Sequence, residues 1–409
     1  MWLLVVQRLY GGAPLETAVL ELLSGLPAEF WSRPCKRIRD WRERGKPLSS
    51  HTGAYNQARQ ALPLLVVQQS CDRIFEELSA RMIPSSGEPA MRAFVLDGTS
   101  MRMAHTPSLT ESFPPSSNQH GPWHWPVARV LVAHDLRTGL AMRPEWGPMS
   151  GPDAVSEQRL LETALGRLPR GATVIGDANF GVFSVACAAQ QAGHPMLLRL
   201  TAVRAQHLAG EALTDGMDRV IVWRPTREDR RSHPELPEDA CVRGRLIVCQ
   251  VQPDNGAEPF LLALFTSLPS PTQELLDLYG QRWKIETDLR TLKQELRLDQ
   301  LTCTTPDMAA KEIEMSIAAY NLVRAVICLA SEQSGLSPRE YGFTKVRRII
   351  QVFAPKIAAD TDPQEAKRLF DQMMHYVQQA KLPRRRRKRP AYSREIWNRG
   401  AKFPNRKSR

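Results

Sequence analysis

The sequence predicts an α/β protein in which a mixed-sheet domain lies between two helical regions. Two observations lead to this fold class. Between residues 89 and 202, short apolar runs come first as strands and then alternate with helix-like segments, which is typical of a mixed sheet. Residues 203–259 lose the helical pattern and carry β-branched runs, whereas the segments at both ends of the chain repeat their apolar residues at helical spacing.

Residues 1–88 are expected to form a helical N-terminal domain. Apolar residues recur at helical spacing over residues 15–23, and Leu62-Pro63 separates two further helical segments. Ser49-Ser50 is expected to cap the first of these two helices. The segment 33–46 holds seven bases and two acids. Short helices with clustered bases are compatible with a DNA-contacting module, although a solvated face on an ordinary helical bundle explains the same residues.

The sheet domain is expected in two parts, 89–202 and 260–335, separated by a β-rich insertion over 203–259. In the first part we expect strands at 93–96, 127–133, 140–146, 173–175 and 196–200, and helices at 158–165 and 181–191. The insertion holds strands at 219–223 and 245–251. The second part has a strand at 260–265, a long helix from 272 to about 298 and a helix at 307–332. A helical region at 336–380, with helices at 338–353 and 364–380, precedes a basic tail at 381–409.

The net charge belongs to the tail. The chain of 409 residues carries a formal charge of +12, and residues 381–409 hold 13 of its 55 basic residues and one acid. The remaining 380 residues hold 42 bases and 42 acids and are therefore electrically balanced. A cationic run of this density binds polyanions in a salt-dependent way. We therefore expect nonspecific DNA binding by Arg384, Arg385, Arg386 and Arg387, although such a run can also serve only for solubility.

Composition excludes several classes of protein. A hydrophobic fraction of 42% and a charged fraction of 24% are ordinary for a globular chain. No uninterrupted apolar run approaches the roughly 18–20 residues that cross a bilayer, so no membrane partner is expected. The opening MWLLVVQR is too short for a signal-peptide core. Seven scattered cysteines without a CxxC pair indicate a reducing compartment, and a cytoplasmic protein is expected.

Two aspartates follow apolar strands. Asp97 comes after AFVL and Asp177 after TVIG. Strand ends in an open α/β sheet line the ligand crevice, and a buried run before the carboxylate holds it rigidly. An aspartate in this position also serves as a turn or cap residue. Both residues are candidate catalytic carboxylates that are expected where their strands end.

A polar stripe is expected on the long helix that begins at residue 272. Tyr279, Arg282, Glu286 and Lys293 fall within about 60° of one another on a continuous α-helix. One carboxylate flanked by two cations and a phenol suits a phosphate-facing site. A solvated helix face with ordinary ion pairs gives the same pattern. The neighbouring Trp283 could stack on DNA bases or pack in the core.

These motifs together resemble a known family. The spacing Y-(2)-R-(3)-E-(6)-K of the polar stripe is similar to the C-terminal signature of bacterial insertion-sequence transposases of the DDE class. LDGTSMRM around Asp97 and VIGDANFG around Asp177 resemble the two aspartate motifs of that family, and AYNQARQALP resembles part of its N-terminal region. The resemblance covers about residues 50–340. It implies an RNase H-like catalytic fold with a β-rich insertion between the second aspartate and the glutamate.

The resemblance also implies an activity. Asp97, Asp177 and Glu286 would hold two Mg²⁺ or Mn²⁺ ions, since hard divalent cations favour carboxylate oxygens. Tyr279, Arg282 and Lys293 would contact phosphates near the transposon end. The protein would cut double-stranded DNA at the terminal inverted repeats of its element and join the 3′ ends to target DNA, as a homodimer in a synaptic complex. A decayed DNA-binding derivative and a nuclease without joining activity remain alternatives.

Other polar residues point to structure rather than chemistry. His120 and His124 have a spacing that could suit zinc, but no third ligand is close in sequence, and a loop is expected. Asp135 precedes Leu-Arg-Thr-Gly and is expected in a turn. Trp123 and Trp125 are expected in loop or core packing. The sequence has no nucleophile elbow and no Walker loop.

Overall fold

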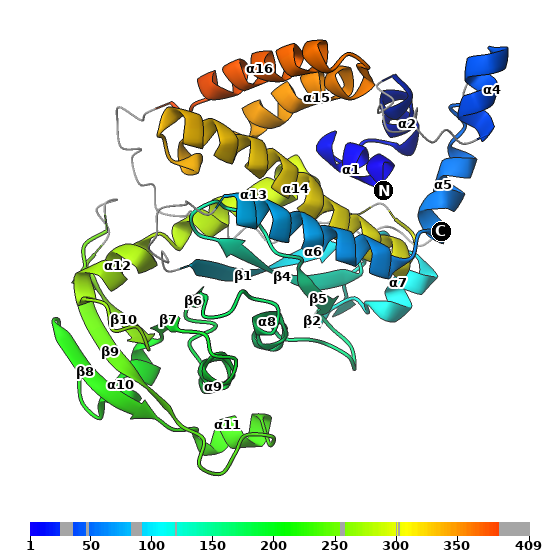
Figure 1. Cartoon of the computed structure of the whole chain (residues 1–409). Coiled ribbons are helices and arrows are strands. Elements are labelled where there is room, and N and C mark those ends of the chain that lie inside the picture. Colours follow the sequence, from blue (N-terminus) through cyan, green and yellow to red (C-terminus); the bar gives the residue numbers. More distant parts are fainter. Residues whose placement is uncertain are drawn as a thin grey trace.

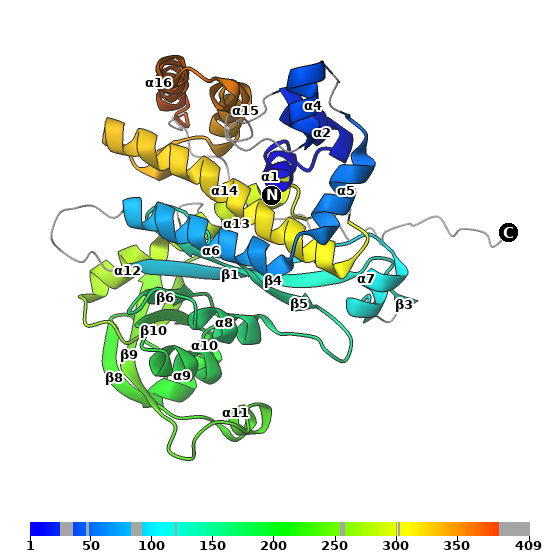
Figure 2. The ribbon, with the colours of Figure 1, turned by 45° about the vertical axis from the view of Figure 1, so that its right-hand side comes forward.

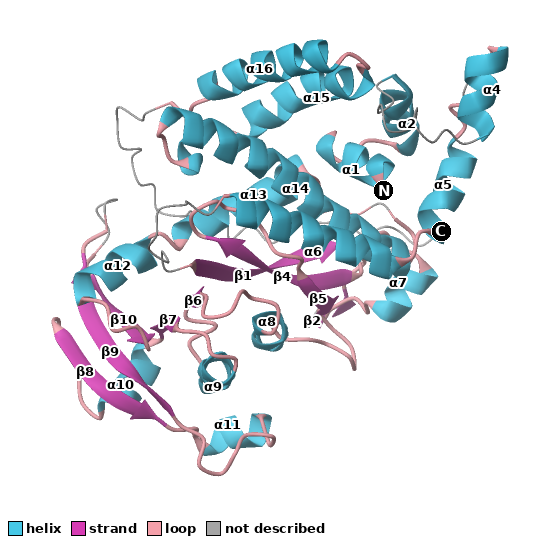
Figure 3. Cartoon of the chain, in the orientation of Figure 1, coloured by secondary structure: helices cyan, strands magenta, loops and turns pink. Residues whose placement is uncertain are grey.

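A computed structural model of the chain describes residues 1–24, 36–45, 49–82, 92–118, 121–253, 258–299, 301 and 303–383. At its centre is one eight-stranded sheet with helices on both faces (Figure 1 and Figure 3). The strand order is β5-β4-β1-β6-β7-β10-β9-β8. The bounds are β1 Ala93–Arg102, β4 Val127–Asp135, β5 Glu145–Pro148, β6 Thr173–Gly176, β7 Met196–Leu200, β8 Met217–Trp223, β9 Val242–Val251 and β10 Phe260–Thr266. The α/β prediction with a mixed sheet is thereby confirmed.

The sheet is parallel at its centre and antiparallel toward both edges. Strand β1 pairs in parallel with β6, and β6 with β7, while the other neighbouring strands pair in antiparallel fashion. Strands covered on both faces read as continuous apolar runs, which explains why AFVL and TVIG show no polar alternation. Strands β8 and β9 join the sheet through β10, so the sheet is continuous across the expected insertion.

Alternate residues of β1 face two different cores. Ala93 and Val95 contribute to the core beneath α13 (Trp283–Glu295) and α14 (Pro306–Ser334). Phe94 and Leu96 point to the opposite core, beneath α8 (Glu157–Leu165), α9 (Phe183–Gln191) and α10 (Ala202–Ala209). Figure 1 shows the first pair of helices above the sheet and α8 and α9 below it. The two faces of the sheet are therefore covered by helices from different parts of the chain.

Several N-terminal helices pack against α14. The described N-terminal helices are α1 (Trp2–Leu9), α2 (Leu15–Ser24), α4 (Lys36–Arg44), α5 (Thr52–Ala61) and α6 (Leu64–Arg81). Of these, α1, α5 and α6 contact α14, and α6 lies beside it in both views (Figure 1 and Figure 2). The buried Glu312 of α14 pairs with Arg8 of α1 and, at 2.9 Å, with Arg59 of α5. Ser49 does not cap α5, because its hydroxyl accepts from the His51 backbone N–H at 3.2 Å and His51 is itself the N-cap residue.

Helix α14 is long and apolar enough, by length and composition, to cross a membrane, and it is the one such helix in the part of the chain that the structure describes. The apolar-run criterion missed it because charged residues interrupt the pattern. Of its apolar window, 83% is buried inside the protein. Its apolar character therefore follows from its place in the core, where it lies between the sheet and the outer helices α15 (Phe343–Ala359) and α16 (Pro363–Gln379).

Two expected elements between residues 140 and 298 differ in the structure. The segment 140–146 forms a continuous strand only from Glu145 onward, as β5. Before it, Ala141 forms an isolated bridge with His134 of β4, and the backbone N–H and C=O of Ala141 bond the side chain of Asn321 at 2.8 and 2.7 Å. The expected helix from 272 to 298 is divided into α12 (Thr272–Gly280) and α13. At the junction the N–H groups of Gln281 and Arg282 bond carbonyls three residues back, so the backbone tightens there.

Shorter elements complete the fold. Helix α7 (Pro107–Ser112) precedes a small hairpin of β2 (Ser117–Asn118) and β3 (Gly121–Pro122), and α11 (Arg227–Ser232) lies between β8 and β9. The turn η1 (Pro338–Glu340) and the helix α15 replace the single helix expected at 338–353. All six cysteines in the described ranges are free.

Candidate active site

Asp97 of β1 and Asp177, which directly follows the neighbouring parallel strand β6, face the same side of the sheet. Val95 of β1 is paired with Ile175 of β6, and strand alternation puts each aspartate on the face of the residue two positions before it. Asp177 directly follows the end of β6, as expected. Asp97 does not end its strand, because β1 continues to Arg102 by pairing with β4. Asp97 lies instead just beyond the last residue of β1 that pairs with β6, which is Val95.

The carboxyl group of Asp97 lies in an environment that disfavours its charge. Its pKa is raised to about 6. Burial is the largest cause, the Gly98 N–H at 2.8 Å acts in the opposite direction, and the nearby Asp177 carboxylate contributes to the rise. The guanidinium of Arg282 lowers this pKa, and the carboxylate of Glu157 raises it. A bound cation would therefore be favoured beside Asp97.

The junction of α12 and α13 brings Tyr279, Arg282 and Glu286 to the same face of the sheet. Tyr279 and Arg282 are each 6% exposed. Arg282 pairs with Glu286 at 3.7 Å, and its guanidinium acts electrostatically on Asp97 and on Tyr279, whose pKa is raised by burial. Arg282 therefore lies between the aspartate of the sheet and the glutamate of the helix.

The next two predicted residues have different surroundings. Lys293 donates from Nζ to the hydroxyl of Thr99 at 2.9 Å, so it reaches β1 on the face that carries Asp97. Trp283 is 62% exposed, and the Arg282 guanidinium lies 4.9 Å from its ring centroid. Core packing of Trp283 is thus excluded, and its ring is available to a partner.

The three candidate carboxylates have the ligand chemistry that a hard divalent cation requires. Asp97, Asp177 and Glu286 supply carboxylate oxygens, the ligands that Mg²⁺ and Mn²⁺ prefer. Within the described ranges no group of three His, Cys, Asp or Glu side chains is already gathered to hold a metal ion. Asp97 and Asp177 interact with each other, whereas Glu286 is directed to Arg282.

A protein-family comparison decides the classification. The family model described as "Transposase DDE domain" matches residues 88–322, more than half of the chain, and this range includes both aspartates and all of α12 and α13. The chain belongs to the DDE transposase family.

Individual relatives of this family member are distant. It is 24% identical over 355 residues to the transposase InsG for insertion sequence element IS4 of Escherichia coli K12, which covers 85% of this chain and 77% of that relative. Among solved structures, it resembles the piggyBac transposase synaptic complex with hairpin DNA with a TM-score of 0.40 and 11% identity. That match covers 89% of this chain and 77% of the other.

The sequence motifs missed three polar residues at the site of this DDE transposase. Glu157, the first residue of α8, accepts from Asn179 at 2.6 Å, and Asn179 follows Asp177 by two residues. Arg199 of β7 acts electrostatically on Tyr279 and lies 5.7 Å from the ring centroid of Phe260. A signal for Asn179 was present in VIGDANFG. No local pattern identifies Glu157 or Arg199, because the fold brings them in from other elements.

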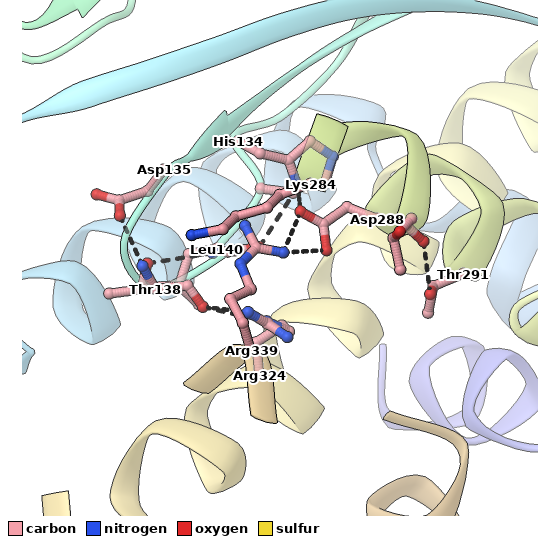
Figure 4. Close-up of polar contacts among 12 residues, drawn as sticks. His134, Asp135, Thr138, Leu140, Lys284, Asp288, Thr291, Arg324 and Arg339 are labelled. Carbon is pink, nitrogen blue, oxygen red and sulfur yellow. Dashed lines mark hydrogen bonds and ion pairs between the residues drawn. The ribbon is translucent and has the colours of Figure 1, made fainter. Parts of the chain in front are cut away.

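A buried ion pair fixes the helix that carries Glu286. Asp288 is 3% exposed, and Arg339 of η1 bonds both of its carboxylate oxygens at 2.5 Å (Figure 4). Burial opposes the charge of Asp288, but the interactions with Arg339, His134 and Arg324 together outweigh it, and the pKa of Asp288 is lowered. Nδ1 of His134, on β4, lies 3.9 Å from Oδ2 of Asp288. Burial lowers the pKa of His134 to about 4, so its imidazole is neutral near pH 7. The pair with Arg339 therefore ties α13 to the C-terminal region.

The remaining predictions have simple outcomes. Asp135 is a turn residue, since its Oδ1 accepts from the backbone N–H groups of Arg137 and Thr138 at 3.0 and 2.9 Å. His124 stacks on His105 with ring centroids 4.4 Å apart. His120 and the expected DNA-binding residues Arg384, Arg385, Arg386 and Arg387 lie outside the described ranges.

Proposed function

We propose that this protein is a DNA transposase that cuts double-stranded DNA at the terminal inverted repeats of an insertion sequence and joins the 3′ ends to target DNA. Membership of the DDE transposase family supports the general activity. The observation that carries the proposal is the position of Asp97 in β1 and of Asp177 directly after the adjacent strand β6, on the face where the α12–α13 junction presents Arg282 and Glu286.

The part of the sheet formed by β5-β4-β1-β6-β7 is proposed as the RNase H-like catalytic core. It contains both aspartate-bearing strands, and its parallel centre is flanked by antiparallel strands. The N-terminal helices are proposed to bind the transposon ends, with α4 at the outer end of α5 (Figure 1). We propose that the enzyme acts in the cytoplasm as a homodimer that holds two DNA ends.

The residues of the site divide the chemical work. Asp97, Asp177 and Glu286 would hold two Mg²⁺ or Mn²⁺ ions, which supply activation of the attacking oxygen and stabilisation of the leaving oxygen in phosphoryl transfer. Arg282 offers a forked donor to a DNA phosphate, and Lys293 offers a point charge.

Two further residues face the DNA in this proposal. Tyr279 is held by burial beside Arg282. The exposed ring of Trp283 can stack on a base.

Three single substitutions test the assignment. Asp97→Ala, Asp177→Ala and Glu286→Gln are each expected to abolish cleavage of a plasmid that carries the element ends, and joining of a pre-cut end, while DNA binding in a gel-shift assay stays within about threefold. Glu365→Gln, in an exposed pair on α16, is the matched control and should retain both activities.

The outcomes separate the alternatives. Full strand transfer by any of the three variants overturns the site. A wild-type protein that cuts but never joins is a nuclease, and one that binds ends without cutting in any divalent metal is a silent DNA-binding derivative.

A further inference from the structure

We propose that Glu157 and Asn179 are positioning residues of the active site, and that Glu157 acts from the opposite face of the sheet through a gap left by Gly98. The inference rests on the proposed function, because it assigns a role in holding the Asp177 carboxylate and in attracting the divalent cation. Neither residue belongs to the aspartate–aspartate–glutamate set or to the polar stripe.

Helix α8 delivers Glu157 to the sheet. Its N-cap residue, Ser156, accepts from the Arg159 N–H at 3.1 Å, which makes Glu157 the first helical residue. An acidic side chain is stabilised in the first turn of a helix. The position therefore tolerates a carboxylate. Helix α8 packs against β4 and β5, and from there the Glu157 side chain reaches Gly98 of β1.

Gly98 makes room for this carboxylate. Strand alternation turns residue 98 toward α8, while Asp97 faces α13. A Cβ added at Gly98 would lie 2.4 Å from Cδ and 2.6 Å from Oε1 of Glu157. The carboxylate thus occupies the space in which any other side chain at position 98 would stand, and from there its charge raises the pKa of Asp97.

Asn179 transmits the contact to the second aspartate. Its side-chain amide donates to Oε2 of Glu157 at 2.6 Å, and its backbone N–H donates to Oδ1 of Asp177 at 2.9 Å. Gln158 donates to the side-chain and backbone oxygens of Asn179 at 2.8 and 2.9 Å. The turn after β6 is therefore held from α8, and with it the orientation of the Asp177 carboxylate.

The charge of Glu157 is not neutralised by an ion pair. Among the residues that the structure describes, no Lys, Arg or His side chain forms a salt bridge with it. If Glu157 only held the turn after β6, an amide side chain at this position would hold it equally well. An unpaired charge beside Asp97 and Asp177 instead adds to the negative field that attracts a cation.

The test measures Mn²⁺ binding to the full-length, DNA-free protein by calorimetry, together with the Mn²⁺ concentration that gives half-maximal joining. Partners of metal ligands typically contribute roughly ten- to hundredfold in metal affinity. Glu157→Ala and Asn179→Ala are expected to weaken Mn²⁺ binding by about tenfold or more, with a corresponding shift in the joining curve. Glu157→Gln keeps an oxygen for Asn179 but loses the charge, so it should fall between wild type and Glu157→Ala.

Glu162→Gln is the matched control, because Glu162 lies on the same helix but pairs with Arg159. Far-ultraviolet circular dichroism and the melting temperature identify a variant that fails to fold. If Glu157→Ala does not fold, the Mn²⁺ affinity of Glu157→Gln is compared with that of wild type instead. Unchanged Mn²⁺ affinity in folded Glu157→Gln and Asn179→Ala overturns the inference. If the wild type binds Mn²⁺ but never joins DNA, the proposed function fails, whereas the affinity comparison still decides the role of Glu157.

Discussion

Asp97→Asn is expected to stabilise the metal-free protein at pH 8 while abolishing its chemistry. The pKa of Asp97 is raised from its ordinary value of 3.8 to about 6, mainly by burial. That difference is about two pH units, each worth about 1.4 kcal/mol, so the ionised carboxylate costs the folded state about 3 kcal/mol. Asparagine removes this cost and keeps an oxygen that can accept from the Gly98 N–H.

The pH dependence has a definite sign. Because the pKa of Asp97 is higher in the folded than in the unfolded chain, the folded state binds the proton more tightly between these two values. The free-energy cost of the ionised Asp97 carboxylate to the folded state is therefore absent below about pH 4, grows as the pH rises and reaches its full value above about pH 6. Asparagine should give its full benefit at pH 8 and almost none at pH 4.

Urea unfolding in EDTA, followed by circular dichroism, measures this difference. The free energy of unfolding of Asp97→Asn should exceed that of wild type by about 3 kcal/mol at pH 8, and the excess should shrink as the pH approaches 4. Added Mg²⁺ should stabilise wild type but not the variant, since binding to the folded state adds to stability. A variant that is less stable than wild type at pH 8, or an excess that is equal at both pH values, refutes the reasoning.

Three further predictions concern other parts of the molecule. Gly98→Ala should reproduce the loss of Mn²⁺ affinity of Glu157→Ala, because the new Cβ displaces the Glu157 carboxylate; calorimetry measures it. Arg339→Ala should lower the free energy of unfolding by about 3–5 kcal/mol, because it leaves Asp288 charged and unpaired in the interior; urea unfolding measures it. Removal of residues 384–409 should weaken DNA binding and reduce the slope of log affinity against log salt by about 0.9 for every phosphate that the tail neutralises; titrations at several salt concentrations measure it.

Each of these predictions has its own control. Adding Glu157→Ala to Gly98→Ala should cause little further loss of Mn²⁺ affinity, because both substitutions remove the same Glu157 carboxylate from its place. Fully additive losses would contradict this explanation. Arg368→Ala breaks an exposed pair on α16 and should change stability by less than about 1 kcal/mol. The truncation begins after Pro383 because Lys381 and Leu382 bond Tyr341 and Glu340. Loss of catalysis at saturating DNA would show that the tail belongs to the active assembly.

The sequence predicted the parts of the fold that depend on local burial. AFVL and TVIG are apolar because both faces of their strands are covered, so the strands and their aspartates could be read directly. The mixed sheet and the helices α8, α9 and α14 follow from patterns of the same kind. The concentration of net charge in the tail is likewise a property of sequence alone.

Tertiary structure decided what depends on contacts between distant segments. Ala141, in the expected strand at 140–146, bonds through its backbone N–H and C=O to the side chain of Asn321 on the distant helix α14. The approach of Glu157 to Asp97 depends on the packing of α8 behind Gly98.

The orientation of the helix that carries Glu286 shows the same dependence. Asp288 of that helix is held by Arg339 of η1, the turn that follows α14. Periodicity records which face of an element is buried, but it carries no information about which side chain from elsewhere in the chain will meet that face. The sequence by itself therefore determined the catalytic candidates and their strands, whereas packing decided how those candidates are held.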